Sequence, residues 1–432
     1  MKSTRTLGRR DHVQQGVTLD GRSDGAFEVG RGRSGTGVAG RRSVAGLDDL
    51  FAAALAAAPT GAGVAAALRL AQRVGRATAL PGRGRTADYF ETLATLAAAD
   101  VTVARVVEPH LDALAILDEC PVPVDLAAIG ADEASTWGVF AAEAAGVRLD
   151  AATDDGGWVV RGTKPWCSLA GDLTHALVTA HVDGDGGSAR QLFAVALGQE
   201  GVDVHPEAWV SRGFVEVPSG PVDFADVRAV PVGEPGWYLE RAGFEWGGIG
   251  VAACWFGGAV GVARRVLEAA GRKGDDVGAL HAGRCASALF AARSALAAAA
   301  ARIDEGGAGG RRDGGDDGDG SRPRGDGDGG DAGESLGGGD GTAAQPGRDD
   351  ARILAQTVRA VVRSACDTVL HEAGQALGPA PLALDAAYAA RVADLSLYLR
   401  QDHGARDEVR LGRLLVEESQ RHAHPEQRGG AS

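Results

Sequence analysis

Basic residues and aromatic side chains are scarce in this chain of 432 residues. The 44 lysines and arginines are outnumbered by 58 aspartates and glutamates, which leaves a formal net charge of -14 at pH 7. A general nucleic-acid-binding protein would carry a basic face, and a protein that docks on anionic lipid would carry basic clusters. The acidic balance argues against both classes of protein, so we predict no nucleic-acid partner and no membrane partner.

Cysteine is also scarce, and its distribution excludes two kinds of structural site. The five cysteines lie far apart, form no CxxC pair and are odd in number: Cys120, Cys167, Cys254, Cys285 and Cys366. A disulfide framework or a zinc cluster needs paired or closely spaced cysteines. The sequence also has no run of eighteen apolar residues and no apolar signal segment near its first residues. We therefore expect a soluble cytoplasmic protein with no metal centre.

Glycine, by contrast, is abundant, with 66 residues, and it gathers in segments that lack an apolar pattern. Residues 1–45 mix Gly, Arg, Ser and Asp without a period, and residues 306–350 hold 18 glycines and 10 aspartates. Such segments bury too little apolar surface to offset the entropy that is lost on ordering. We predict a disordered arm over 1–45, a disordered linker over 306–350 and a tail over 421–432. Calcium-binding repeats are the alternative for the linker, but their nine-residue period is absent.

The apolar pattern of the remaining chain changes twice and divides it into three parts. Residues 46–133 are rich in Ala and Leu at helical spacing. Residues 134–235 hold short β-type runs separated by glycine-containing turns, with a hairpin turn expected at 154–157. Helical spacing returns over 236–305 and again over 351–420. The sequence predicts an α+β fold with an N-terminal helical domain, a middle antiparallel β domain and a C-terminal helical bundle that the linker interrupts.

The segment from Gly157 to Ala170 holds the most specific motif in the chain. It keeps two aromatic residues, a glycine, a lysine and a hydroxyl at fixed spacing: Trp158, Gly162, Lys164, Trp166 and Ser168. Together with the helix, β, helix order, this motif resembles a hairpin of the acyl-CoA dehydrogenase superfamily. The resemblance spans 46–305 and 351–420. It implies that the middle domain is a β-barrel, that the C-terminal part is a four-helix bundle, and that FAD is the cofactor.

Trp166 and Ser168 are the residues that the resemblance places on the flavin. Two residues apart on a strand, their side chains would point to the same side. The indole would then form a flat wall for the flavin ring, while the hydroxyl would hydrogen-bond near N5, the atom that accepts hydride. The alternative is that Trp166 belongs to the core and that Ser168 is a loop hydroxyl.

Five further residues resemble flavin-binding positions of the family. Glu143 and Gly146 match part of a loop that contacts flavin and substrate, although the Thr, Pro, Ser and Asp of that loop are missing. Arg272 matches an arginine that reaches the FAD phosphates. Gly374 and Gly378 match a glycine stretch that approaches the pyrophosphate of a neighbouring subunit. The alternatives are a surface arginine and ordinary glycines at a helix C-terminus.

The resemblance places the catalytic base in the last long helical region, at Asp402 or His403. Counting from Asp394 puts Asp402 on the family's glutamate, whereas alignment on Gly404 selects His403. A carboxylate or a neutral imidazole can remove a proton when it lies within hydrogen-bond reach of the substrate. His110 is a third candidate, because the monooxygenase branch of the superfamily has an active-site histidine in its N-terminal domain. The alternatives are a solvated, charged helix for the pair and a helix-end histidine for His110.

Three functions remain open at this point. The resemblance implies an FAD-dependent acyl-CoA dehydrogenase that oxidises a Cα–Cβ bond by proton removal and hydride transfer to flavin N5. A flavin-dependent monooxygenase of the same fold, acting through a C4a-peroxyflavin, is the first alternative, and a non-catalytic paralogue that serves as an assembly module is the second. The implied partners are an acyl-CoA or similar small molecule, an electron acceptor (a flavoprotein or oxygen), and further copies of the chain in a homodimer or homotetramer.

Overall fold

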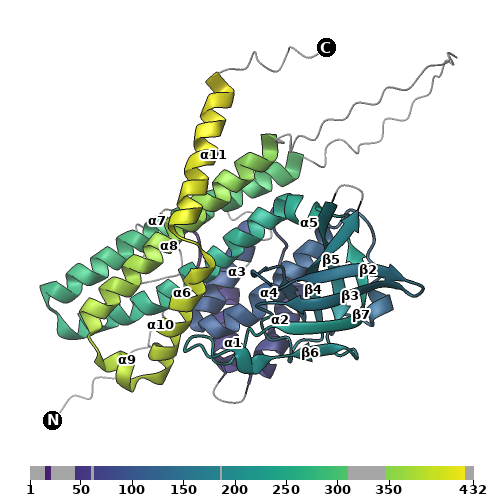
Figure 1. Ribbon diagram of the computed structural model, residues 1–432. Helices are drawn as coiled ribbons and strands as arrows, with labels where there is room; N and C mark the ends of the chain where they lie inside the picture. Colours follow the sequence, from purple (N-terminus) through teal and green to yellow (C-terminus); the bar gives the residue numbers. More distant parts are fainter. Residues whose placement is uncertain (1–14, 21–43, 60–62, 185–186, 310–345, 424–432) are drawn as a thin grey trace, which may run out of the picture.

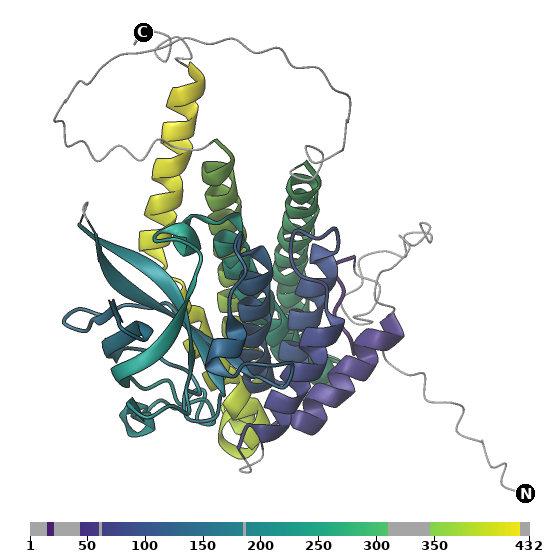
Figure 2. The same cartoon turned by 90° about the vertical axis from the view of Figure 1, so that its right-hand side faces the viewer.

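The computed structural model of the chain describes residues 15–20, 44–59, 63–184, 187–309 and 346–423. A helical N-terminal part, a central β domain and a helical C-terminal part follow one another along the chain. The β domain lies against one side of the helices (Figures 1 and 2). The predicted α+β class and the order of its three parts are therefore confirmed.

Four helices form the N-terminal part: α1 Val44–Ala57, α2 Ala65–Ala77, α3 Thr86–Ala99 and α4 Val101–Glu119. α4 begins directly after Asp100, whose carboxylate accepts a hydrogen bond from the backbone N–H of Val103. This is the side-chain cap that aspartate favours before a helix. α3 is buried along its whole length and therefore forms the centre of the helical core.

Residues 15–20 correct the prediction of a disordered arm. Val17 and Leu19 are buried, and their backbone N–H groups donate to side-chain oxygens of Thr95 and Glu91 on α3, both at 2.9 Å. The arm was predicted from the average composition of 45 residues. Two apolar residues that can pack, such as Val17 and Leu19, hardly change that average. The arm also ends earlier than predicted, because α1 begins at Val44. Residues 1–14 and 21–43 lie outside the described residues, so the prediction for them stays a prediction.

Seven strands form the β domain: β1 Trp137–Phe140, β2 Leu149–Asp154, β3 Gly157–Lys164, β4 His175–Gly184, β5 Gly187–Ala196, β6 Val202–Val204 and β7 Val222–Val232. The order β4-β2-β3-β7-β5 closes into a barrel because β5 pairs with β4 as well as with β7. The predicted hairpin turn joins β2 to β3, with Gly157 at φ +111°. The barrel is not purely antiparallel as predicted, because β4 pairs in parallel with β1 and β2. The alternation of apolar and polar residues along a strand does not show whether the neighbouring strands run parallel or antiparallel to it.

Within the described residues, the C-terminal part holds seven helices and a short 3₁₀ segment: α5 Trp237–Glu240, α6 Ala242–Lys273, α7 Asp276–Gly309, α8 Pro346–Leu377, α9 Ala380–Leu384, α10 Ala386–Tyr398, η4 Leu399–Gln401 and α11 Ala405–Ala423. α6, α7 and α8 pack against one another, α10 packs on α6, and α11 projects beyond them (Figure 1). Helices occupy most of 236–305 and 351–420 as predicted, but α7 and α8 extend four and five residues into the predicted linker, and α11 extends three residues into the predicted tail. Extending an existing helix by a few residues costs little, so composition alone misplaces its end. The arrangement as a four-helix bundle stays a prediction. Residues 310–345 and 424–432, in the predicted linker and tail, lie outside the described residues.

Close packing of α6 on α3 depends on a small residue. A Cβ at Gly257 of α6 would lie 2.0 Å from the backbone oxygen of Ala94 on α3, so no larger side chain fits between the two backbones. α6 and the 276–306 part of α7 are long and apolar enough to cross a membrane by length and composition alone. Because 78% of the apolar window of α6 is buried within the fold, this is weak evidence for a membrane span.

Candidate functional site

A cavity of about 630 Å³ lies where the barrel meets α4 and the end of α10, and we call it the barrel cleft. Its barrel side consists of Val139, Ala141, Ala142, Glu143, Trp166, Ser168, Trp209, Phe214 and Ser219. Its helical side consists of Arg105, Glu108, Pro109, Asp112, Tyr238, Val251, Leu397, Tyr398, Arg400, Gln401 and His403. Its size lies in the range of about 300–1,000 Å³ that small-molecule sites usually have.

Trp166 presents an indole ring to the barrel cleft. Its side chain is largely accessible, since the residue is 58% exposed, and its backbone has φ +60°. A bulky residue is rarely held in this left-handed region, and such strain gathers at ligand sites. Because β3 ends at Lys164, Trp166 and Ser168 lie in the turn after the strand, so the expected strand geometry is wrong. The turn nevertheless brings both residues to the cleft.

Ser168 is joined to the helical side of the cleft by hydrogen bonds. Its hydroxyl accepts from Nη2 of Arg105 at 2.9 Å and lies 2.8 Å from the hydroxyl of Ser219. Nη1 of the same arginine lies 3.2 Å from Oε2 of Glu108. The hydroxyl of Tyr398 donates to that oxygen at 3.4 Å. One polar network therefore connects the turn after β3 with α4 and α10.

Glu108 is the most strongly perturbed carboxyl group in this network. It is 6% exposed, and burial raises its pKa to about 7, although the guanidinium of Arg105 and the hydroxyl of Tyr398 oppose the shift. A group with a pKa near neutrality can both hold and release a proton under ordinary conditions. Glu108 therefore has the properties of a proton-transferring group in the cleft.

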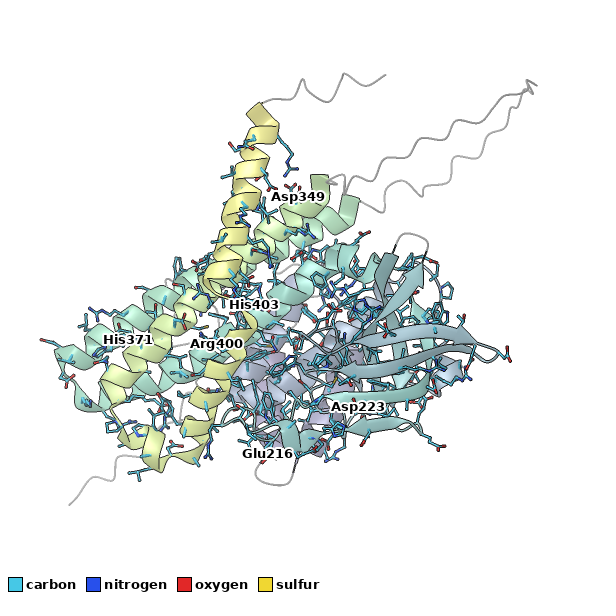
Figure 3. The ribbon with its side chains drawn as sticks, in the orientation of Figure 1. Glu216, Asp223, Asp349, His371, Arg400 and His403 are labelled. Atoms are coloured by element: carbon cyan, nitrogen blue, oxygen red, sulfur yellow. The ribbon has the colours of Figure 1, made fainter. Side chains whose placement is uncertain are left out.

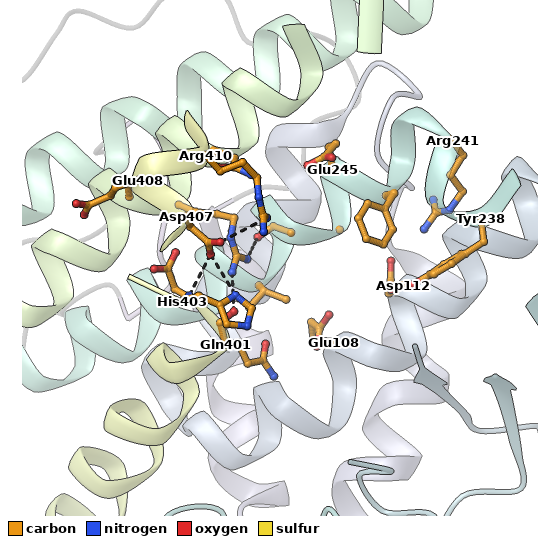
Figure 4. Close-up of a pocket in the computed structure, with 18 residues that line it drawn as sticks. Glu108, Asp112, Tyr238, Arg241, Glu245, Gln401, His403, Asp407, Glu408 and Arg410 are labelled. Carbon is orange, nitrogen blue, oxygen red and sulfur yellow. Dashed lines mark hydrogen bonds and ion pairs between the residues drawn. The ribbon is translucent and has the colours of Figure 1, made fainter. Parts of the chain in front are cut away.

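A second cavity, of about 340 Å³, adjoins the barrel cleft between α4, α6, α8 and the start of α11, and we call it the helix cavity. The two cavities share six lining residues: Glu108, Asp112, Tyr238, Val251, Gln401 and His403. Glu108 and Asp112 stand one turn apart on α4 and direct their carboxylates into this space (Figure 4). The barrel cleft and the helix cavity therefore form one continuous site.

The side chains of the predicted pair, Asp402 and His403, lie in different environments. Asp402 is buried, lies 3.1 Å from Nε of Arg363 on α8, and accepts a hydrogen bond from the backbone N–H of Gly404 at 2.7 Å. It lines the helix cavity but not the barrel cleft. The side chain of His403 is 64% exposed, lies 3.4 Å from the carboxylate of Asp407, and lines both cavities (Figures 3 and 4).

His110 lies on α4 but contacts neither the barrel cleft nor the helix cavity. The residue is buried beside Gly75 of α2, where an added Cβ would lie 2.9 Å from the imidazole Nε2. Burial, and secondarily the charge of Arg76, lower the pKa of His110 to about 4, so its imidazole is neutral near pH 7. The helix carries Glu108 into the cleft and turns His110 away from it.

The predicted cofactor-binding residues fall into two places. Glu143 lies at the barrel cleft, where it contacts His181 and Arg190 through its carboxylate at 3.0 and 3.5 Å. Arg272, Gly374 and Gly378 line neither the cleft nor the helix cavity.

These three distant residues nevertheless lie close to one another in the bundle. Lys273, next to Arg272 at the end of α6, donates a hydrogen bond to the backbone oxygen of Ala376 on α8 at 3.0 Å. Gly374 and Gly378 flank that oxygen along the chain. Figure 3 shows His371, which precedes them on α8, far along the bundle from His403. Their predicted role in binding FAD stays a prediction.

The sequence analysis did not select Arg105, Glu108, Asp112 or Tyr398, although one signal was present. Glu108 and Asp112 are four residues apart in a helix whose other side chains are mostly apolar. Residues at this spacing lie on the same face of a helix. Two acids on one face of an otherwise apolar helix indicate a polar site within the core.

The residues of the barrel cleft fit the flat ring of a flavin. The indole of Trp166 supplies an aromatic surface, and the rings of Trp209 and Phe214 add apolar walls. The hydroxyls of Ser168 and Ser219 supply hydrogen-bonding groups beside them. Sites for cofactors of this size typically combine apolar walls with a few such polar groups.

No model of a known protein family matches this sequence, and no relative is found among curated proteins. Solved structures do match. The complex of TdsC from Paenibacillus sp. A11-2 with FMN and indole is 17% identical, with a TM-score of 0.67 over 86% of this chain and 96% of TdsC. Methanesulfinate monooxygenase MsuC from Pseudomonas fluorescens is 16% identical, with a TM-score of 0.64 over 86% of this chain and 95% of MsuC.

A third solved structure is XiaF from Streptomyces sp. in complex with FADH2 and glycerol. It is 15% identical, with a TM-score of 0.61 over 82% of this chain and 89% of XiaF. At these identities the likeness concerns the fold. It covers most of this chain and nearly all of each solved protein.

Proposed function

We propose that this chain, which has the fold of the acyl-CoA dehydrogenase superfamily, is a flavin-dependent monooxygenase. Of the proteins that share its fold, MsuC is a monooxygenase by name, and TdsC is named as dibenzothiophene monooxygenase. TdsC was solved with FMN and XiaF with FADH2. These likenesses support the monooxygenase alternative better than the acyl-CoA dehydrogenase that the sequence motif implied first.

The observation that carries the proposal is the position of the carboxyl groups around the barrel cleft. Asp402, which matches the dehydrogenase base by sequence, is paired with Arg363 and does not line the cleft. Glu108 does line the cleft, and its pKa of about 7 suits a group that gives and takes protons near neutrality. We therefore propose Glu108 on α4 as the proton-transferring group in place of Asp402.

Each residue of the network has a role in this proposal. Trp166 and Ser168 would hold the flavin ring, by stacking and by hydrogen bonding. A reduced flavin bound there would supply electrons and activate dioxygen, so that one oxygen atom enters the substrate. Arg105 fixes the side chains of Ser168 and Glu108 relative to each other, because it donates a hydrogen bond to each of them. Glu108 holds or releases a proton at Oε2, beside the hydroxyl of Tyr398.

The first experiment measures flavin binding and then separates the two chemistries. FMN and FAD are titrated separately into purified protein while flavin fluorescence is followed. The loaded protein then receives acyl-CoA thioesters without oxygen. We expect flavin binding but no bleaching of the flavin absorbance. Reduced flavin with dioxygen and a panel of small aromatic and amine substrates should instead yield an oxygenated product by mass spectrometry.

Two outcomes of that experiment would reject the proposal. Bleaching by an acyl-CoA would establish the dehydrogenase, and the predicted base at Asp402 or His403 would then be tested first. Failure to bind either flavin would leave the non-catalytic paralogue as the function.

Trp166→Ala tests the placement of the flavin. Loss of one aromatic stacking surface typically costs about 1–3 kcal/mol, so flavin affinity should fall by about fivefold to a hundredfold. The thermal midpoint should change little, because the indole is largely exposed. Trp246→Ala is the matched control, since Trp246 borders a different cavity and should leave flavin affinity unchanged. Equal flavin affinity in wild type and Trp166→Ala would remove this residue from the site.

A further inference from the structure

We propose that the helix cavity binds a small organic amine as its cation, with Asp112 as the anionic partner of the ammonium group. Asp112 lines the helix cavity, the barrel cleft and a third cavity of about 290 Å³. Under the proposed function this amine is the substrate, and that part of the inference rests on the proposed function. The binding site itself is tested independently below.

Acidic side chains predominate among the charged residues that line the helix cavity. Carboxylates outnumber guanidinium groups six to three among the residues that line it: Glu108, Asp112, Glu245, Asp402, Asp407 and Glu408, against Arg241, Arg359 and Arg410. Charged clusters of one sign in a cleft concentrate ligands of the opposite sign, and they do so most strongly where water is excluded.

Five of these six carboxylates already have a cationic partner within the protein. Glu108 pairs with Arg105, Glu245 with Arg352, Asp402 and Glu408 with Arg363, and Asp407 with Arg410. Asp112 forms no ion pair and accepts no hydrogen bond within the part of the chain that the structure describes. Burial raises the pKa of Asp112, and the charge of Arg241 opposes the shift, so an ammonium group bound beside this carboxylate would stabilise its charged form.

Arg241, the cation that attracts Asp112, is already paired with another carboxylate. Arg241 attracts Asp112 electrostatically, but its Nη1 lies 2.5 Å from Oε2 of Glu119, and its guanidinium stacks over the ring of Tyr238 at 5.2 Å. The other oxygen of Glu119 accepts the backbone N–H of Gly243 at 3.0 Å. Arg241 is thus held at the start of α6 and leaves the cavity face of Asp112 open.

Aromatic rings stand beside this carboxylate. Tyr238 and Phe244 line the helix cavity and form an edge-to-face pair, with ring centroids 5.5 Å apart and planes at 87°. Figure 4 shows Tyr238 and Asp112 on the same side of the cavity, with Glu108 one helical turn away. An ammonium ion is favoured both by a carboxylate and by a neighbouring aromatic face. The arrangement fits a ligand with an apolar body and a protonated amine.

The test compares three ligands that share a phenylethyl group by calorimetry on the purified full-length protein: 2-phenylethylamine, 2-phenylethanol and 3-phenylpropionate. We expect the amine to bind at least tenfold more tightly than the alcohol, and the acid not to bind. Asp112→Asn should remove this preference while leaving the affinity for the alcohol unchanged. Asp118→Asn is the matched control, because Asp118 lies on the same helix but pairs with Arg83 outside the helix cavity.

An amine that binds no better than the alcohol to wild-type protein would overturn the inference without any variant. So would an Asp112→Asn protein that keeps the tenfold preference. Flavin binding and oxygenase activity are measured separately, so the two proposals fail independently. A protein that selects the amine through Asp112 but has no oxygenase activity would retain this site and lose the proposed function.

Discussion

Burial makes Glu108 titrate near neutrality, and this has a consequence for stability. Its pKa rises from 4.5 to about 7 on folding, so the native state favours the protonated carboxyl group. The stabilisation is fully present below about pH 4.5 and is lost as the pH rises through about 7. A shift of this size corresponds to about 3 kcal/mol.

Glu108→Gln, which is neutral at every pH, should therefore flatten the pH dependence of stability. Between about pH 5 and pH 8, wild type should lose up to about 3 kcal/mol of unfolding free energy that the variant keeps. Urea unfolding at a series of pH values measures this difference. Parallel curves for the two proteins would show that Glu108 titrates normally.

His110 provides a comparison of opposite sign at the same helix. Its pKa is lowered to about 4 by burial, so the native state is destabilised as the pH falls from about 6.5 towards 4. The same loss is present in wild type and in Glu108→Gln, and it cancels when the two are compared. Sequence reasoning selected the histidine of Glu108-Pro-His110, whereas the helix places the glutamate at the cleft.

At the scale of elements, Asp402 connects the start of α11 to α8. Its carboxylate pairs with Arg363, which also pairs with Glu408 of α11. Asp402→Asn removes one of three carboxylate partners of the half-buried Arg363, which keeps Asp367 and Glu408, and we expect the free energy of unfolding to fall by about 1–2 kcal/mol. His403→Gln changes an exposed side chain and should alter it by less than about 0.5 kcal/mol. Thermal and denaturant unfolding of both variants test this.

The same two variants also decide between structure and catalysis. If Asp402→Asn is as stable as wild type yet loses two orders of magnitude in flavin-dependent rate, the base predicted from the sequence is the correct one. We expect the reverse, with lower stability and intact flavin binding, because Asp402 lies outside the barrel cleft.

At the scale of the whole molecule, α7 and α8 pack against each other on either side of residues 310–345. Those residues lie within the segment rich in glycine and aspartate, and the cost of closing a loop grows only slowly with its length. Replacing 310–345 with a short Gly-Ser link should leave the thermal midpoint and the flavin affinity within experimental error. Differential scanning calorimetry and a flavin titration check this, and a large drop in either would reveal contacts made by the segment.

The sequence by itself determined the class and the order of the parts, because periodicity is a local property. Helical spacing before and after the β-type runs predicted the three parts, and the Gly157–Ala170 motif resembled a hairpin of the acyl-CoA dehydrogenase superfamily. Trp166 and Ser168 were also found this way, since the motif marks them directly. Both line the barrel cleft, although on a turn and not on a strand.

Only the tertiary structure decided which polar side chains share the site. The twist of α4 places Glu108 at the cleft and His110 against α2. Tyr398, whose hydroxyl donates to Glu108, lies 290 residues further along the chain. The parallel pairing of β4 and the burial of Val17 and Leu19 likewise depend on partners far along the chain. Burial, and with it the pKa of Glu108, arises from these distant contacts, which a local pattern does not contain.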